Sequence, residues 1–228
     1  MQLHVDAEFR NDYAGDLVST NEPAATIAPR FFLGHTTLGL IVRFRNDVPA
    51  DRRRSLEKAL TVAERAPSMS ALGQPLDAMP FERILSHDSP IQHTSVGLAF
   101  RFPRSLPPAL GTRVLRDAED AALLHPLLAA WAGDIRASPP LVAVLIDGHA
   151  VAVCGSVRIT PRAHEAGLET AAPFRGRGYG RAAVSAWATA VRAVAAEPLY
   201  STTWQNDASR AVAHTLGLIP VGRDLHIR

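Results

Sequence analysis

The stretch Arg175-Gly176-Arg177-Gly178-Tyr179-Gly180 decides how this chain folds. Its three glycines allow a tight turn with backbone amides facing outward. The residues before it favour a strand, and those after it favour a long helix. The first turn of such a helix has free N–H groups and the positive end of the helix dipole, which together favour an anion. We therefore predict a phosphate-binding loop, although a plain glycine-rich turn remains the alternative from this stretch alone.

Two better-known glycine loops do not match these residues. A nucleotide-binding Walker loop ends in Gly-Lys-Ser/Thr, which is absent here. A dinucleotide-binding fold has G-x-G-x-x-G after its first strand and an acid about 20 residues later. The spacing in this chain is G-x-G-x-G, late in the sequence, and Tyr200 stands where the acid is expected.

A second motif follows the loop at a characteristic distance. Asn206-Asp207-Ala208-Ser209 begins a short helix that ends at Leu216-Gly217-Leu218. The pattern Arg/Gln-x-x-Gly-x-Gly/Ala is met by Arg175, Gly178 and Gly180. Over residues 112–228, the order strand, glycine loop, helix, strand and Asn-led helix resembles the GNAT superfamily of N-acetyltransferases.

The resemblance implies a fold, a substrate and a set of contacts. The fold class is α/β (α+β), with a mixed, mostly antiparallel central sheet flanked by helices that splays where acetyl-CoA enters. Acetyl-CoA is the implied acetyl donor, and the acetyl group passes directly to an amine without a metal. The implied coenzyme A contacts are Leu168, Glu169, Thr170, Arg175, Gly176, Arg177, Gly178, Tyr179, Gly180, Asn206 and Ser209.

An amine acceptor needs to lose a proton before it attacks. An alkyl amine with a pKa of about 10.4 is neutral in only about one part in 2,500 at pH 7, so a base or a water chain helps. His164, Glu165 and Glu169 are the candidates, because the family often carries a carboxylate on this strand. Alternation along a strand places His164 on one face and both glutamates on the other, unless a bulge intervenes. His164 and Glu165 remain near-equal candidates, and Glu169 is the third.

One departure from the family concerns the general acid. Many members carry a Tyr seven residues after the Asn, and this chain has Ala213 there. His214, Tyr200 and Tyr179 are the alternatives. Because a thiol with a pKa of about 8.5 is a tolerable leaving group, transfer remains feasible without a donor.

The second half of the chain, residues 106–228, is predicted as the acetyltransferase domain. Asp147-Gly148 between two β-rich runs predicts a hairpin. Asp117 is a predicted N-cap of a helix to Ile135, which Pro126 breaks. The remaining predictions are strands at 163–170, 199–204 and 219–227 and helices at 179–196 and 207–216.

Residues 1–105 are predicted as a smaller α+β region. We expect two strands around a glycine turn within 31–44, a helix over 47–66, mostly loop over 67–95 and a strand at 96–102. This region has too few apolar repeats for a large core of its own, so we expect it to dock on the second part and shape the acceptor site in the cleft.

Composition limits the classes of protein. The 228 residues are 47% hydrophobic and 20% charged, which is typical of a globular chain. No apolar run is long enough for a membrane span, no secretory signal is seen, and the lone Cys154 excludes an internal disulfide, so a cytoplasmic protein is expected. No Cys/His cluster suggests zinc. Cys154, Trp131 and Trp187 are predicted to be core residues.

The partners follow from the same observations. The acceptor is expected to be a small-molecule or peptide amine, with no nucleic acid and no membrane, and a homodimer is left open. Net charge is only +2, although 23 of the 24 basic residues are Arg, so an Arg-rich nucleic-acid binder is the weaker alternative. A non-catalytic acyl-CoA-binding or regulatory module is the main alternative to an enzyme.

Overall fold

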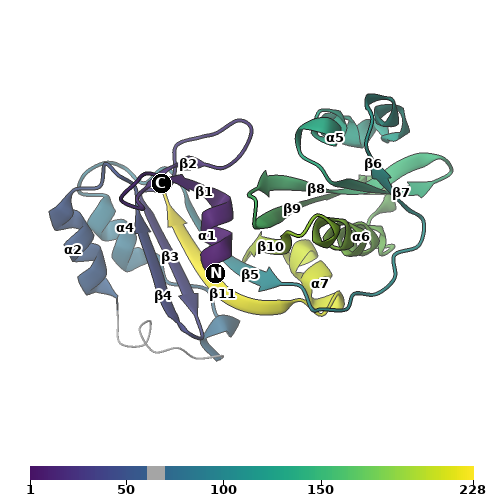
Figure 1. Ribbon diagram of the computed structural model, residues 1–228. Helices are drawn as coiled ribbons and strands as arrows, with labels where there is room; N and C mark the ends of the chain where they lie inside the picture. The colour runs from purple at the N-terminus through teal and green to yellow at the C-terminus, as the bar shows by residue number, and fades with distance from the viewer. Residues whose placement is uncertain (61–69) are drawn as a thin grey trace. The chain divides into compact units, whose positions relative to one another are not determined.

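The computed structural model describes residues 1–60 and 70–228. The chain forms two compact units (Figure 1). Unit 1 comprises Met1–Phe100, Ser201–Asp207 and Pro220–Arg228, and unit 2 comprises Arg101–Tyr200 and Ala208–Ile219. In the described part of the chain, no helix is both long and apolar enough to cross a bilayer.

The sheet of unit 2 has the strand order β10-β9-β8-β7-β6. Neighbours from β6 to β9 are antiparallel, and β9 and β10 are parallel, so the predicted mixed, mostly antiparallel sheet is confirmed. The predicted hairpin is confirmed too, with Asp147 and Gly148 at φ 48° and 80°. The strands are β6 (Thr112–Leu115), β7 (Leu141–Ile146), β8 (His149–Ile159), β9 (Ala163–Thr170) and β10 (Glu197–Thr203).

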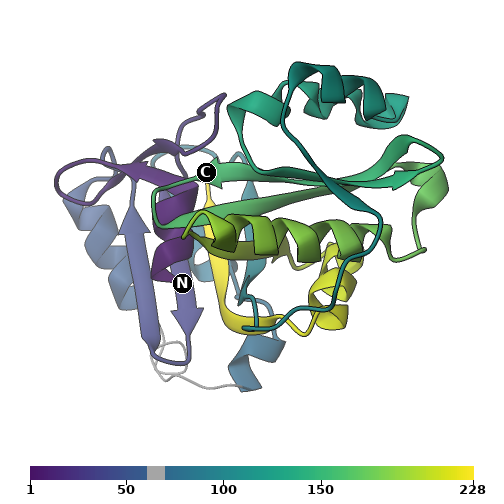
Figure 2. The same cartoon turned by 45° about the vertical axis from the view of Figure 1, so that its right-hand side comes forward.

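Helices cover both faces of this sheet (Figure 2). On one face lies α6 (Tyr179–Ala193), which buries Val184, Trp187 and Val191 at spacings of three and four. Over the other face lie three short helices, and α7 (Asp207–Thr215) follows β10 and ends at Gly217 with φ 64°. The three short helices are η2 (Ala118–Leu123), η3 (Pro126–Ala132) and α5 (Asp134–Ala137).

The segment 117–135 differs from its prediction in helix type. Asp117 is the N-cap as predicted, in a capping box in which the Asp120 carboxylate accepts the Asp117 N–H. However, η2 and η3 are 3-10 helices. Pro126 lacks an N–H group, and His125 before it is extended, so the chain restarts there instead of continuing as an α-helix.

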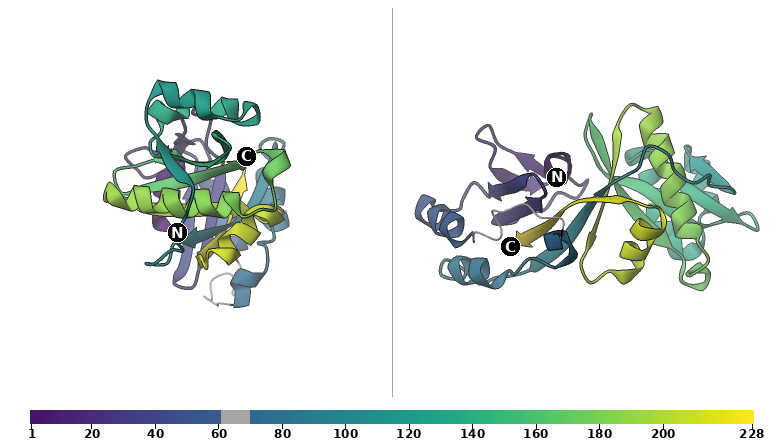
Figure 3. Two further views of the ribbon diagram at one scale, coloured as in Figure 1. Left: turned by 90° about the vertical axis from the view of Figure 1, so that its right-hand side faces the viewer. Right: turned by 90° about the horizontal axis from the view of Figure 1, so that it is seen from below.

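Unit 1 contains the strand order β4-β3-β11-β5. Both β4 and β11 are antiparallel to β3, so the last strand lies beside strands of the first fifty residues (Figure 3). The elements are α1 (Gln2–Glu8), β1 (Phe9–Asn11), β2 (Leu17–Thr20), β3 (Phe31–Thr36), β4 (Gly39–Phe44), α2 (Ala50–Ala59), η1 (Ser70–Gly73), α4 (Met79–Leu85), β5 (Thr94–Arg101) and β11 (Ile219–Ile227).

Two predictions in this unit need correction. The loop predicted over 67–95 is wrong at α4, a two-turn helix with Pro80 in its first turn that buries Phe81 and Leu85 in the core. Such a short helix has too few turns to show periodicity. The helix predicted over 47–66 is α2, which begins at Ala50 and ends at Ala59, where Leu60 is extended. The last residues of the prediction, 61–66, lie outside the described residues.

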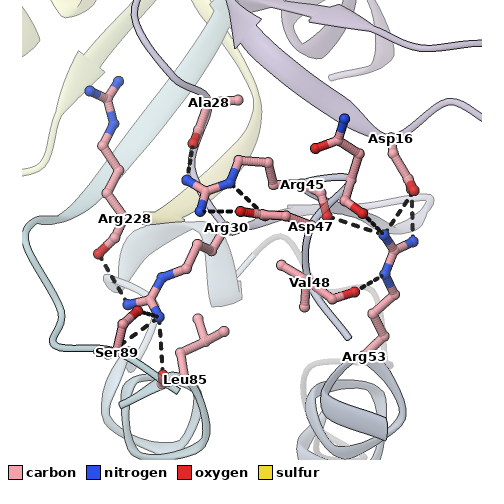
Figure 4. A network of polar contacts seen from close by, with 11 residues as sticks. Asp16, Ala28, Arg30, Arg45, Asp47, Val48, Arg53, Leu85, Ser89 and Arg228 are labelled. Carbon is pink, nitrogen blue, oxygen red and sulfur yellow. Dashed lines mark hydrogen bonds and ion pairs between the residues drawn. The ribbon is translucent and has the colours of Figure 1, made fainter. Parts of the chain in front are cut away.

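Three arginines connect the irregular segments of unit 1 (Figure 4). Buried Arg30 donates to the backbone oxygens of Leu85, Ser89, Pro90 and Arg228 and to Ser89 Oγ. Arg45 donates to Ala28 O and pairs with Asp47. Arg53 forms a two-point ion pair with Asp16 and also donates to Val48 O. These guanidinium groups supply hydrogen-bond donors to carbonyls at the ends of elements and in loops, although Leu85 O and Arg228 O also accept backbone N–H groups.

Candidate functional site

The predicted phosphate loop lies directly before α6. Gly176 and Gly178 have φ 74° and 81°, a left-handed conformation that costs a residue with a side chain about 1–2 kcal/mol. Gly178 is the N-cap residue of α6, and no side chain of the described residues caps this helix. The first N–H groups of α6 are therefore open to a ligand.

The third glycine has a different role. A Cβ on Gly180 would lie 3.0 Å from Thr170 Oγ1 and 3.5 Å from the Leu168 methyl groups. Gly180 therefore lets α6 pack closely on β9. Arg175 Nε donates to Thr170 O at 3.1 Å, which ties the loop to the end of the same strand.

A cavity of about 270 Å³ adjoins the loop within unit 2. Its wall includes Arg177, Gly178 and Arg181 on one side and the segment 107–110 on another. The guanidinium of Arg177 also stacks over the Phe174 ring at 5.8 Å. Two arginines beside an uncapped helix start make this cavity favourable for phosphate groups.

The sheet separates at β9, in agreement with the splayed sheet that the family resemblance implies. The parallel pairing of β9 with β10 covers three positions and ends at Glu165 opposite Leu199. Residues 166–170 of β9 continue beyond this pairing toward the loop, while they stay paired with β8 on the other side. Five strand residues span about 16 Å. An extended ligand can therefore lie along this edge and form hydrogen bonds with the backbone N–H and C=O groups of residues 166–170.

The two faces of β9 alternate as predicted. Leu168 and Thr170 contact α6 at Gly180, and His164 bonds to Ser156, which is also bonded by Trp187 of α6. On the opposite face, Trp131 of η3 donates from Nε1 to Glu169 Oε2 at 2.7 Å.

The Trp131 indole lies on a pair of glycines. Gly155 of β8 and Gly167 of β9 are opposite each other, and a Cβ on either would come within 3.0 Å of the indole. The missing side chains therefore let a large ring lie against the sheet beside Glu169.

The family of one domain follows from a comparison of the sequence with family models. The model of the acetyltransferase (GNAT) family matches residues 110–218, which include the loop, α6 and α7. These residues form a GNAT acetyltransferase domain. The resemblance inferred from the two motifs is thereby confirmed. No protein of curated function matches the sequence.

One solved structure supports the same fold. A GCN5-related N-acetyltransferase-like protein from Streptococcus suis is 12% identical with a TM-score of 0.50, over 88% of this chain and 85% of that one. A putative GNAT acetyltransferase from Novosphingobium aromaticivorans is 19% identical with a TM-score of 0.49. That match covers 60% of this chain and 65% of the Novosphingobium chain. At such identities, the likeness to the Streptococcus structure shows the fold alone.

The candidate bases of the GNAT domain differ in their surroundings. His164 is 8% exposed, and burial lowers its pKa below the usual 6.5. Glu165 is 1% exposed at the last position paired with β10. Glu169 is partly buried with one oxygen bonded to Trp131. The base remains unassigned among these residues, and its identity stays a prediction.

The candidate acids are also distinguishable. Ala213, at the family Tyr position, is fully buried, and His214 beside it is exposed. Burial raises the pKa of Tyr200 to about 12, and its hydroxyl bonds to Ser209 Oγ at 2.7 Å. Tyr200 is therefore a protonated hydroxyl at neutral pH. Tyr179 is the first residue of α6, and Asn206 immediately precedes α7.

Three residues of the GNAT domain have polar contacts that the sequence does not predict. Trp131 and Trp187 are predicted only as core residues, and no pattern points to Ser156. Trp187 is fully buried, but its N–H group has a specific partner. The glycines of β8 and β9 are the available signal for Trp131, because a strand glycine often marks a close approach.

Other predictions concern cysteine and metals. Cys154 is fully buried, and burial raises the pKa of its thiol well above the usual value, so it is a core residue as predicted. Among residues 1–60 and 70–228, no group of three or more His, Cys, Asp or Glu side chains could hold a metal ion.

Proposed function

We propose that this protein transfers an acetyl group from acetyl-CoA to an amine. The observation that carries the proposal is the start of α6, where two left-handed glycines leave a helix end without a side-chain cap. The residues fit coenzyme A: its phosphates suit the open N–H groups with Arg177 and Arg181 nearby, and its pantetheine amides suit the backbone of residues 166–170.

The chemistry requires three contributions from the chain. The loop holds the phosphates, the edge of β9 positions the extended arm, and the apex of the β9–β10 separation receives the thioester. Glu165 and Glu169 are the proposed carboxylates for the proton that the amine loses, directly or through water. The acceptor is proposed to be a small-molecule or peptide amine.

The first test replaces Gly178 with Asp. The new Cβ would lie 3.9 Å from Arg181 Nη2, so the added carboxylate would compete with the phosphates for Arg181 and the helix start, and the left-handed φ of 81° adds strain. We expect coenzyme A affinity in calorimetry to fall by more than about a hundredfold, since lost charge-assisted hydrogen bonds contribute about 1.5–3 kcal/mol each.

Gly15→Asp is the matched control. Gly15 has a φ of 84° and is exposed in the β1–β2 turn of unit 1, and a Cβ added there would have no atom within 4 Å. This variant adds the same charge at the same backbone conformation and should bind coenzyme A as the wild type does. Unchanged affinity in a folded Gly178→Asp protein would refute the loop as the binding site.

Turnover separates an enzyme from a binding module. A panel of primary amines with acetyl-CoA should yield free thiol and an N-acetyl product in at least one case. Tight coenzyme A binding with no acetylated amine would instead favour the non-catalytic acyl-CoA-binding or regulatory module.

A further inference from the structure

Beneath α6, three polar side chains form a buried chain of hydrogen bonds. Trp187 Nε1 donates to Ser156 Oγ at 3.2 Å, and Ser156 Oγ lies 2.9 Å from His164 Nδ1. Trp187, Ser156 and His164 are 0%, 1% and 8% exposed. Apolar packing alone does not explain why these three residues are buried together, because each has a polar atom with a specific hydrogen-bond partner.

Hydrogen counting fixes the direction of this chain. An indole N–H only donates, so Ser156 Oγ is the acceptor for Trp187. The single hydroxyl hydrogen of Ser156 has His164 Nδ1 as its remaining polar neighbour among the described residues. Because a buried hydroxyl hydrogen is rarely left without an acceptor, Ser156 donates to Nδ1. A neutral imidazole that accepts at Nδ1 carries its proton on Nε2.

The surroundings of His164 keep the ring neutral. Burial lowers its pKa below 6.5, and no charged group contributes to that shift. At neutral pH, His164 therefore presents a fixed Nε2–H group. A ring in this tautomer cannot accept a proton at Nε2, so it is not a base there.

The position of His164 in the sheet gives this N–H group a use. His164 lies opposite Pro198, one position before the β9–β10 pairing ends at Glu165. Its Nε2 has no hydrogen-bond partner among the described residues, and it is not one of the fully enclosed unpartnered atoms. The donor thus stands at the apex of the strand separation, with capacity for one further acceptor.

We propose that His164 is a catalytic hydrogen-bond donor to the acetyl thioester, and that Ser156 and Trp187 are positioning residues that fix its tautomer. This inference rests on the proposed function. The amine nitrogen forms a bond to the acetyl carbon, and the carbon–sulfur bond breaks. His164 stabilises the negative charge that develops on the thioester oxygen and then on sulfur, and it transfers no proton. The proton lost by the amine passes through a carboxylate or water to the departing thiolate, so atoms and charge balance.

Neutral histidine has a precedent as such a donor, because a fixed N–H group needs no change in protonation to polarise a carbonyl. The role also accounts for the missing Tyr at Ala213. If His164 on β9 donates a hydrogen bond to the thioester and the departing sulfur, a second donor on α7 is less needed.

Two substitutions at His164 separate the donor role from the base role. In His164→Gln, the amide nitrogen reaches the place of Nε2 and keeps an N–H donor there, whereas in His164→Asn it reaches only the place of Nδ1. Both variants should bind coenzyme A as the wild type does. We expect kcat to fall about a hundredfold in His164→Asn and less than about tenfold in His164→Gln. In His164→Gln, activity should still decrease at low pH as it does in the wild type, because His164 is not the group that titrates.

The same experiment contains the results that would overturn the proposal. Equal activity of His164→Asn and the wild type would remove the donor role. If kcat fell as far in His164→Gln as in His164→Asn, and the decrease in activity at low pH disappeared, His164 would be a base. If no amine is acetylated and coenzyme A does not bind, the proposed function fails together with this role.

Nuclear magnetic resonance on the full chain gives a readout that does not depend on turnover. Two-bond nitrogen–proton correlations of His164 should show the Nε2–H tautomer in the wild type, and acetyl-CoA should shift this N–H resonance. Ser156→Ala removes the donor to Nδ1 and should yield a mixture of tautomers with a smaller fall in kcat. A wild-type Nδ1–H tautomer would refute the hydrogen-bond direction, whatever the activity.

Discussion

The two units satisfy their backbone polar groups in different ways. In unit 2, five strands form regular ladders, and glycines such as Gly167 and Gly180 let aromatic and helical groups pack directly on the sheet. In unit 1, arginine side chains donate to backbone oxygens: Arg30 bonds to Leu85 at the end of α4, to Ser89 and to Arg228 (Figure 4), and also to Pro90 O. Neither feature is confined to one unit, because Gly34, Gly97 and Gly222 of unit 1 also lie in close contacts and Arg192 of unit 2 donates to three carbonyls. What distinguishes unit 1 is the group of three arginines that joins its irregular segments.

The largest effect is expected from removal of the Arg30 guanidinium. Arg30→Met removes the side-chain donor of the Ser89 and Pro90 carbonyl oxygens and leaves Leu85 O and Arg228 O with only their backbone donors. Each carbonyl left without a donor costs about 1–3 kcal/mol when it is buried. We expect unit 1 to lose more than about 3 kcal/mol of stability, measured by hydrogen exchange of the β3 amides. Amides of β8 in unit 2 should keep their protection.

Arg54→Met is the control for that experiment. Arg54 is exposed on α2, so its replacement should leave exchange unchanged. If Arg30→Met also left the β3 amides protected, the arginine contacts would contribute nothing to unit 1.

The next largest effect is expected from a substitution that disrupts the glycine packing of unit 2. In Gly167→Ala, the new Cβ would lie 2.2 Å from Val157 Cγ1 and 3.0 Å from the Trp131 ring. Overpacking of this kind costs about 1–3 kcal/mol, and we expect the loss in thermal unfolding. The displaced indole should also weaken its bond to Glu169.

Gly133→Ala is its matched control. Gly133 has helical backbone angles and nothing within 4 Å of an added Cβ, so the change should be neutral or stabilise by up to about 1 kcal/mol. Equal melting temperatures for the two variants would contradict the role assigned to Gly167.

The smallest effect concerns the capping box at Asp120. Hydrogen bonds from the Arg116 and Asp117 N–H groups, with Arg113 nearby, lower the pKa of Asp120 below its usual value. A lowered folded-state pKa stabilises the protein above the unfolded-state pKa of about 3.9, and the contribution is lost as pH falls through the folded-state value. Asp120→Asn should therefore cost about 0.5–2 kcal/mol at pH 7, and less below about pH 4 in denaturant titrations. A pH-independent difference would rule out the charge as the cause.

Much of unit 2 could be predicted because its signals are local. Asp147-Gly148 determines a hairpin through its left-handed backbone, and the apolar spacing around Trp187 determines the buried face of α6. Unit 1 has fewer such signals, although the two strands predicted around a glycine turn within 31–44 are found as β3 and β4. The helix α4 is too short for a visible period, and pairing of β11 with β3 depends on residues far apart in sequence.

The same difference between local and long-range signals applies to the residues of the candidate site. The glycine loop was predictable because Gly176 and Gly178 are needed for the turn of the backbone itself. The tautomer of His164 was not, because it depends on Ser156 from a neighbouring strand and Trp187 from a helix. Alternation along β9 predicts that His164 and Glu169 lie on opposite faces of the strand. It does not predict which side chains of other elements contact each face.

The position of β11 has a consequence for synthesis of the chain. Arg223 and His35 lie opposite each other in β11 and β3, although 188 residues separate them in the sequence. A ribosome makes every residue of the segment Arg101–Tyr200 before it makes the strand that completes the sheet beside β3. Until then, β3 has a free edge able to pair with another chain. The nascent protein is therefore most exposed to aggregation through its N-terminal unit, during the time in which the central strands of the acetyltransferase domain are being made.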